Sequence, residues 1–251
     1  EIMPSLVGSE MCIRDRFPGV LANDRINFEV EQGEIRALLG ENGSGKTTLM
    51  NTLYGIYRPD SGSIIFHGQD VAFRSPKDAI ERGIGMVHQH FMLVPSLTVT
   101  QNIVLGLRSP LGQRSPLLDL KGAENQIGKL AAKYGLEVDL KARVWQLPVG
   151  AQQRVEILKA LYREAELLIL DEPTAVLTDQ EAANVLGLLK RLASQGKAVV
   201  LITHRLNEVT ECADRVTVMR SGKTVIDGVP LKGLNKSDLA KAMVGEGRNP
   251  V

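Results

Sequence analysis

One octapeptide near the amino terminus constrains the fold more than any other feature. It spans residues 40–47, reads GENGSGKT, and matches the pattern of a phosphate-binding loop. Its three glycines allow backbone conformations closed to other residues, so consecutive N–H groups can point at phosphate oxygens. Lys46 adds a mobile positive charge for the outer phosphates, and Thr47 places a hydroxyl where a magnesium ion would bridge them. The motif predicts binding of a nucleoside triphosphate.

The residues on either side support that interpretation. Residues 35–39 read as a buried strand, and a helix is expected from Lys46 to about Tyr54. Such a helix directs the positive end of its dipole at the same anion. The alternative is a glycine-rich turn before a helix, and the strand–loop–helix context argues against it.

Composition limits the class of protein. A hydrophobic content of 43% can fill a sizeable interior, and a net charge of +1 argues against broad attraction to nucleic acid or anionic lipid. Cys12 and Cys212 lack metal-ligand spacing, which indicates a reducing compartment. Apolar runs such as 198–202 are too short to cross a bilayer alone.

Short apolar strands alternate with amphipathic helices, a pattern typical of a mainly parallel sheet covered on both faces. A helix is expected around 181–193, and strand character near 26–30 and 63–66 predicts a small antiparallel layer beside the phosphate loop. The predicted core strands are 35–39, 84–87, 167–170, 198–203 and 215–219.

The strand signal stops between about 89 and 163. One helical face runs over 120–134 and ends at Gly135, and another runs over 151–161. This segment therefore reads as an inserted helical subdomain. The core is then expected to comprise residues 16–88 and 164–235, within a domain that covers 16–251.

An acidic pair follows one buried strand. Residues 167–170 lead directly into Asp171 and Glu172. At the carboxyl end of a strand beside a phosphate loop, such a pair offers one group to hold magnesium and a second to polarise water. We assign Asp171 to the metal and Glu172 to the general base. A strand that meets a polar turn is the alternative.

Two further polar residues follow predicted strands. His204 comes directly after the strand 198–203 and is placed to bond a terminal phosphate or its attacking water. Gln89 follows the strand 84–87 and offers a neutral amide to metal or water. The alternative for His204 is a solvated turn residue, and the signal at Gln89 is weak on its own.

Together these motifs resemble those of the ATP-binding cassette (ABC) family, from about Phe17 to the end of the chain. Phe17 is similar to the aromatic residue that stacks on adenine, with a buried core phenylalanine as the alternative. The matching segments, in the family's order, are Gly40 to Thr48 (Walker A), Gln89 (Q-loop), Leu147 to Arg154 (signature), Leu167 to Glu172 (Walker B), Ala175 to Thr178 (D-loop) and His204 (switch histidine).

The resemblance implies an α/β P-loop NTPase fold of the RecA-like type, with ATP and Mg²⁺ as cofactors. It assigns catalysis to Gln89, Glu172 and His204, metal binding to Thr47, Gln89 and Asp171, and contact with ATP to Phe17. The nucleotide loop comprises Gly40, Glu41, Asn42, Gly43, Ser44, Gly45, Lys46, Thr47 and Thr48.

The family also implies partners. Its members work as head-to-tail pairs, in which the signature covers the ATP of a second cassette, in the same full-length chain or in another subunit. Transporters of this family also contain a multi-span membrane permease and, acting through it, a solute-binding protein. The resemblance therefore implies a location on the cytoplasmic face of the cell membrane, here of a bacterium. No nucleic acid is expected. The signature residues here are Pro148, Val149, Gly150, Ala151 and Gln152.

Within the family, residues 85–95 and 152–159 resemble importers of simple sugars and nucleosides. Those ATPases usually carry two cassettes, and this chain resembles the first, so we expect a fragment of a tandem protein. Two alternatives remain: a soluble cassette that acts on ribosomes or DNA, and a degenerate cassette that binds ATP without turnover.

Two departures from the family pattern matter. Pro148 stands where the family has serine, which removes a hydroxyl and predicts poor hydrolysis at the ATP site that this signature completes. Residues 1–15 do not read as the family's alternating first strand and resemble translated adapter sequence, so we give them no functional role. We expect the loss of that strand to leave an unpaired sheet edge.

Overall fold

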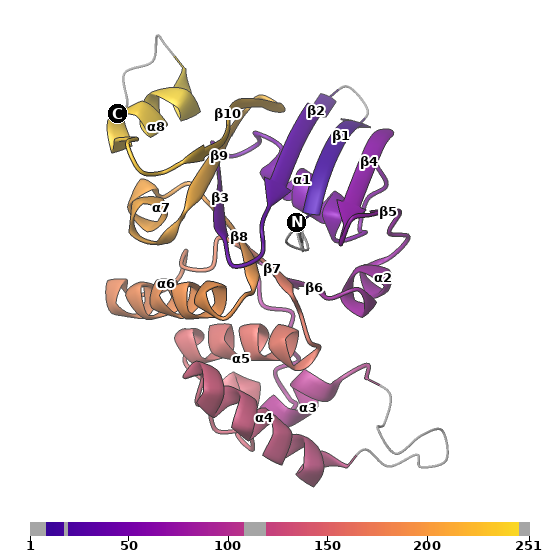
Figure 1. The fold of residues 1–251 in the computed structure, drawn as a ribbon. Helices are drawn as coiled ribbons and strands as arrows, with labels where there is room; N and C mark the ends of the chain where they lie inside the picture. Colours follow the sequence, from indigo (N-terminus) through magenta and orange to yellow (C-terminus); the bar gives the residue numbers. More distant parts are fainter. Residues whose placement is uncertain (1–8, 18–19, 108–118, 246–251) are drawn as a thin grey trace, which may run out of the picture.

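The computed structural model describes residues 9–17, 20–107 and 119–245, which form two β-sheets with helices packed around them (Figure 1). The larger sheet has six strands in the order β10-β9-β3-β8-β7-β6, all parallel except β10. Its strands are β3 (Ile35–Leu39), β6 (Ile84–Val87), β7 (Leu167–Asp171), β8 (Ala198–Thr203), β9 (Arg215–Arg220) and β10 (Lys223–Pro230). This confirms the predicted core strands.

Continuous apolar runs produce this sheet. Every residue of β3, β6, β7 and β8 is buried, as expected for parallel strands that are covered on both faces. The carboxyl ends of β3, β6, β7 and β8 lead into the phosphate loop, Gln89, the acidic pair and His204. The topology therefore brings all four sequence motifs to one edge of the sheet.

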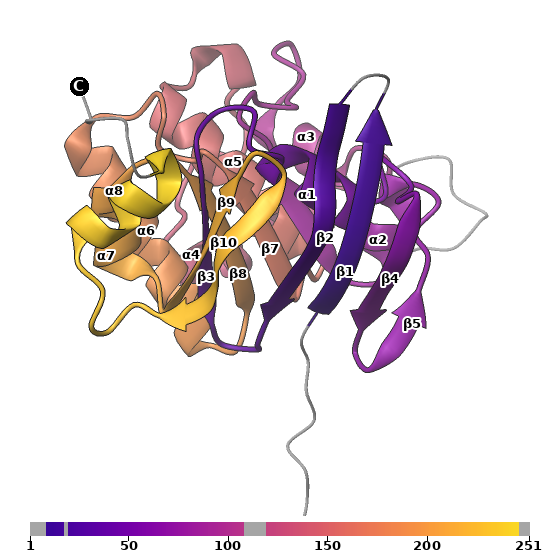
Figure 2. The same cartoon turned by 90° about the horizontal axis from the view of Figure 1, so that it is seen from above.

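The smaller sheet is antiparallel, with the order β2-β1-β4-β5 (Figure 2). Our expectation of an unpaired edge was wrong, because β1 pairs with β2 on one side and β4 on the other. Ile13 is fully buried against the same core as Ile26 and Ile64, which supplies the burial that the sequence pattern did not reveal. The strands are β1 (Ser9–Phe17), β2 (Val20–Val30), β4 (Ser61–Phe66) and β5 (Gln69–Val71).

Helices cover the six-stranded sheet on both faces. Helix α1 (Lys46–Leu53) shares one core with the antiparallel sheet, whereas α5 (Val149–Tyr162) and α6 (Asp179–Ser194) share another on the opposite face. A third core joins β9 to the helices at the carboxyl end of the chain. The remaining core helices are α2 (Pro76–Glu81), α7 (Leu206–Cys212) and α8 (Lys236–Val244).

The segment between β6 and β7 is helical in its described part. It contains α3 (Val99–Val104), α4 (Leu120–Tyr134), the short 3₁₀ helix η1 (Val144–Gln146) and α5. Helices α3, α4 and α5 lie together below the sheet (Figure 1). Gly135 ends α4 in a left-handed conformation, with φ of 66°, as the sequence predicts. Within the described residues, no helix has the length and hydropathy needed to cross a membrane.

Candidate nucleotide site

The phosphate loop connects β3 to α1 and is shaped by its glycines. Gly45 precedes α1 with φ of +101°, a region that other residues rarely adopt. A Cβ atom at Gly45 would lie 2.4 Å from the carbonyl oxygen of Ala22. The loop therefore fits against β2 only with glycine at this position, and its backbone is held in the curled form that a phosphate group requires.

We expect Gly45→Ala to reduce Mg-ATP affinity at least about tenfold, because the strain of left-handed alanine adds to a clash with backbone. The matched control is Gly68→Ala in the β4–β5 turn, where φ is +70° and nothing lies within 4 Å of the added Cβ. Titration calorimetry with ATP measures both. Equal affinity for the two variants would contradict this account of the loop.

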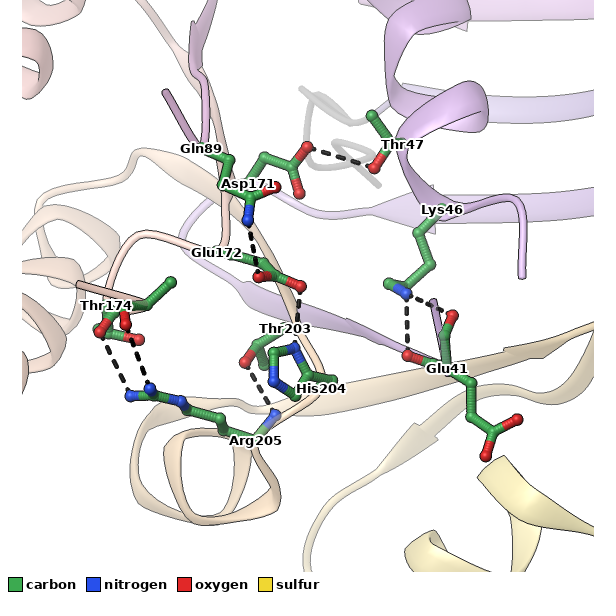
Figure 3. Close-up of polar contacts among 12 residues, drawn as sticks. Glu41, Lys46, Thr47, Gln89, Asp171, Glu172, Thr174, Thr203, His204 and Arg205 are labelled. Atoms are coloured by element: carbon green, nitrogen blue, oxygen red, sulfur yellow. Dashed lines mark hydrogen bonds and ion pairs between the residues drawn. The ribbon is translucent and has the colours of Figure 1, made fainter. Parts of the chain in front are cut away.

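The buried amine of Lys46 is positioned to bind an anion. Its side chain is buried, and Nζ donates to the carbonyl oxygens of Gly40 at 2.8 Å and Glu41 at 2.9 Å (Figure 3). Burial lowers the pKa of this amine, and the carboxylates of Glu172 and Asp171 act in the opposite direction. The loop thus holds a desolvated cation whose hydrogen-bond partners are uncharged: two carbonyl oxygens and, at 3.5 Å, the hydroxyl of Ser44.

Thr47 and Asp171 meet across the site. Thr47 Oγ1 donates to Asp171 Oδ2 at 3.3 Å, which joins the start of α1 to the end of β7 (Figure 3). Burial raises the pKa of Asp171, the nearby Glu172 raises it further, and Thr47 and Lys46 lower it. A hydroxyl and a partly desolvated carboxylate at this separation are the oxygen donors that Mg²⁺ prefers.

Glu172 lies between Gln89 and His204. Its Oε2 accepts from Gln89 Nε2 at 3.3 Å, and its Oε1 lies 2.9 Å from His204 Nδ1 (Figure 3). The backbone of Glu172 is left-handed, with φ of +48°, which is uncommon for a residue other than glycine. This turn directs the carboxylate between the ends of β6 and β8, a detail that the sequence does not reveal.

A cleft of about 660 Å³ contains most of the predicted residues. His204 reaches it only through Glu172, whereas Ala22, Ser221 and Gly222 line it without having been predicted. Gly222 donates from its backbone N–H to the carbonyl oxygen of Ser44, so the β9–β10 turn supports the loop. The lining residues are Ala22, Asn42–Thr48, Gln89, Asp171, Glu172, Ser221 and Gly222.

The predicted signature residues do not lie in this cleft. Pro148 precedes α5 without a side-chain cap, and Val149 is exposed. Gly150 lines a different pocket, beside Leu177 and Glu181. The signature residues therefore do not contribute to this cleft. Phe17 ends β1, but its side chain lies outside the part of the chain that the structure describes.

Comparison with known proteins agrees with this geometry. The family profile described as ABC transporter matches residues 23–175. The chain is 49% identical to the glucose import ATP-binding protein TsgD13 of Haloferax volcanii, over 91% of the chain and 46% of that protein. It is also 49% identical to the nucleoside import ATP-binding protein NupA of Lactococcus lactis, over 93% of the chain and 45% of that protein.

The chain thus spans about half the length of the curated relatives it matches. Among solved structures, a nucleotide-free ATP-binding cassette from an ABC transporter superposes with a TM-score of 0.82 at 24% identity, covering 96% of this chain and all of that one. This structural likeness confirms the predicted fold.

Proposed function

Because the chain belongs to the ABC transporter family, we propose that it binds and hydrolyses ATP as the motor cassette of an importer for nucleosides or simple sugars. One observation carries the proposal: the phosphate loop, the Thr47–Asp171 pair, and Glu172 with its partners Gln89 and His204 line or adjoin a single cleft. Relatives named as glucose, nucleoside, guanosine and ribose import proteins support the choice of solute.

The residues of the cleft fit Mg-ATP. Residues 40–48 bind the phosphates through backbone N–H groups and Lys46, which exchanges its carbonyl partners for phosphate oxygens. Thr47, Gln89 and Asp171 would hold Mg²⁺, which would supply positive charge to offset the negative charge that develops on the phosphates. Phe17 is proposed to stack on adenine.

One side chain then acts on the attacking water, and two others hold that side chain in place. Glu172 serves as the general base, and only 14% of its side chain is exposed, so its carboxylate is partly shielded from bulk solvent. His204 holds one oxygen of that carboxylate, and Gln89 holds the other. Both contacts fix the orientation of the base, which is the main requirement for proton transfer in a preorganised site.

The proposal is tested by titrating purified chain with ATP in the presence of Mg²⁺ or of a chelator. We expect binding at millimolar ATP or below with Mg²⁺. Failure of correctly folded protein to bind Mg-ATP at millimolar concentration, even together with a companion cassette, would remove the basis of the assignment.

Removing the metal ligand provides a separate prediction. Asp171→Asn should abolish the gain in ATP affinity that Mg²⁺ provides and lower turnover at least about tenfold, because the carboxylate that holds the ion is lost. Asp70→Asn, at an exposed position of β5, is the matched control and should leave both unchanged. An undiminished Mg²⁺ effect in Asp171→Asn would place the ion elsewhere.

The proposed partners are a second cassette and a membrane permease, with a solute-binding protein acting through the permease on the far side of the membrane. A groove between β6 and α5 offers a docking place for the permease, with Met92 and Ile56 exposed beside the buried Glu156. We therefore propose the cytoplasmic face of the membrane as the location of the chain. Co-purification with a multi-span protein from membranes tests the assembly.

Pro148 favours unequal ATP sites in such an assembly. The proline supplies neither a hydroxyl nor a backbone N–H at the amino terminus of α5. The site completed by this signature is therefore proposed to hydrolyse poorly, while the site that uses this chain's own Lys46 and Glu172 stays active. Unchanged turnover of the assembled transporter after Pro148→Ser would count against the asymmetry.

A further inference from the structure

A buried polar cluster lies directly behind the acidic pair. Glu208, on α7, is only 5% exposed, and its two carboxylate oxygens accept hydrogen bonds from different segments. Oε2 accepts from Thr203 Oγ1 at 2.8 Å, and Oε1 accepts from Thr174 Oγ1. Both threonines are 1% exposed. We call Thr174, Thr203 and Glu208 the Glu208 clamp.

Arg205 reinforces the same connection. Its backbone N–H donates to Thr203 Oγ1 at 3.0 Å, and its guanidinium donates to the carbonyl oxygens of Thr174 at 3.2 Å and Ala175 at 3.4 Å (Figure 3). Arg205 Nη1 also lies 3.5 Å from Glu208 Oε1. The segment after β7 is therefore tied to the segment after β8 by side-chain bonds at several points.

The positions of the two threonines relate this clamp to the catalytic pair. Thr174 lies two residues after Glu172, and Thr203 directly precedes His204. His204 itself is held loosely, since 46% of its side chain is exposed and its contact with Glu172 is the hydrogen bond at 2.9 Å. The separation of Glu172 and His204 therefore depends on how firmly their two segments are joined.

A carboxylate is a costly choice for a purely structural contact at this place. Burying it requires desolvation that only well-placed donors offset. A glutamate in the first turn of a helix commonly caps backbone N–H groups, but here both oxygens are used by hydroxyls of two other segments. Glu208 therefore serves the junction of these segments more than the helix that carries it.

We propose that Glu208 is a positioning residue, which through Thr174 and Thr203 fixes His204 against Glu172 and so sets the rate of ATP hydrolysis. This inference rests on the proposed ATPase function. Glu208 is not among the residues that line the cleft, so we expect its effect on hydrolysis to pass through the position of His204. Because the effect of Glu208 on hydrolysis depends on His204, it can be distinguished from a general effect on stability.

A double-mutant cycle on ATP turnover tests this dependence. We expect Glu208→Ala to lower kcat about tenfold with KM within about twofold of the starting chain. In a His204→Ala background, the same change should alter kcat less than about twofold, because the contact it supports is already absent. Equal losses in the two backgrounds would overturn the proposal.

Two variants guard against a folding defect. Glu211→Gln, at an exposed site on the same helix, is the matched control and should leave kcat unchanged. Glu208→Gln keeps one acceptor and gains a donor for the threonine hydroxyls, so it should recover most of the turnover. If Glu208→Ala fails to fold, Thr203→Val replaces it in the double-mutant cycle, with the same expected changes in kcat. A kcat for Thr203→Val equal to that of Glu211→Gln would overturn the clamp.

Nuclear magnetic resonance of the imidazole nitrogens gives a readout that does not need hydrolysis. The chain has only 4 histidines, so the signal of His204 can be assigned from His204→Ala. Glu208→Ala should change the chemical shift of His204, as Glu172→Gln is also expected to do. The signals of the other histidines should not change. A chain without ATP turnover would defeat the proposed function, whereas an unmoved His204 signal would defeat the clamp alone.

Discussion

Replacing Glu172 with glutamine should lower kcat for ATP hydrolysis at least about 100-fold, the usual scale for loss of a general base, and should leave Mg-ATP affinity nearly unchanged. The amide cannot accept a proton from water, but it has the shape of the carboxylate. It also retains an oxygen that can accept from Gln89 or His204. Steady-state turnover and ATP titration of the chain, assembled with the proposed second cassette, measure the two effects.

The matched control is Glu164→Gln. Glu164 is exposed, and like Glu172 it has a left-handed backbone, with φ of 62° against 48°. It lines a pocket of the helical segment that does not include the acidic pair. The control therefore makes the same chemical change at a residue with the same backbone conformation, but outside the nucleotide site. Equal hydrolysis by Glu172→Gln and the unaltered chain would show that the base is another group.

Much of the site follows from sequence because its parts occupy strand ends. The runs before Gly40, Gln89, Asp171 and His204 are short and apolar, and parallel strands align their carboxyl ends at one edge of the sheet. The hydrogen bonds of Thr47 to Asp171 and of His204 to Glu172 are consequences of that alignment. Strand assignment alone was enough to bring these residues together.

Other features depend on long-range contacts that no local pattern encodes. Strand β1 was missed because its polar sequence gives little alternation, yet backbone pairing on both sides and the burial of Ile13 stabilise it. Glu208 and Glu211 lie on one short helix, and sequence gives no means to tell the buried glutamate from the exposed one. Only the hydrogen bonds of Glu208 to Thr203 at the end of β8 and to Thr174 beyond β7 distinguish them.

Arg36 is another residue whose role depends on long-range contacts. Among the predicted variants, we expect its replacement to lower stability the most. Arg36 is the second residue of β3 and is 1% exposed. Its guanidinium contacts Glu34 Oε1 at 3.3 Å and Thr217 Oγ1 at 3.2 Å, and lies over the ring of Phe28. A Cβ atom at Gly228 would approach Arg36 Nη2 to 2.1 Å, so the surrounding backbone is fitted to the arginine.

We expect Arg36→Met to lower the free energy of unfolding by about 3 kcal/mol, because it leaves the carboxylate of Glu34 buried without its nearest ionic partner. Chemical denaturation followed by circular dichroism measures the change. Lys77→Met is the control, since Lys77 and Glu81 form an exposed ion pair on α2, and it should cost no more than about 0.5 kcal/mol. Similar losses for both variants would contradict the buried-charge explanation.

The dependence on pH separates lost charge compensation from lost packing. Burial already raises the pKa of Glu34, and Arg36 is one of the groups that oppose the shift. Without Arg36 the folded-state pKa rises further above the unfolded value, so the folded chain binds more protons in that interval. Stability lost by Arg36→Met should therefore be recovered as pH falls through the raised pKa of Glu34.

The double variant Arg36→Met with Glu34→Gln should recover part of the loss at neutral pH and show little of this pH dependence. A loss that is independent of pH in the single variant would assign the role of Arg36 to packing.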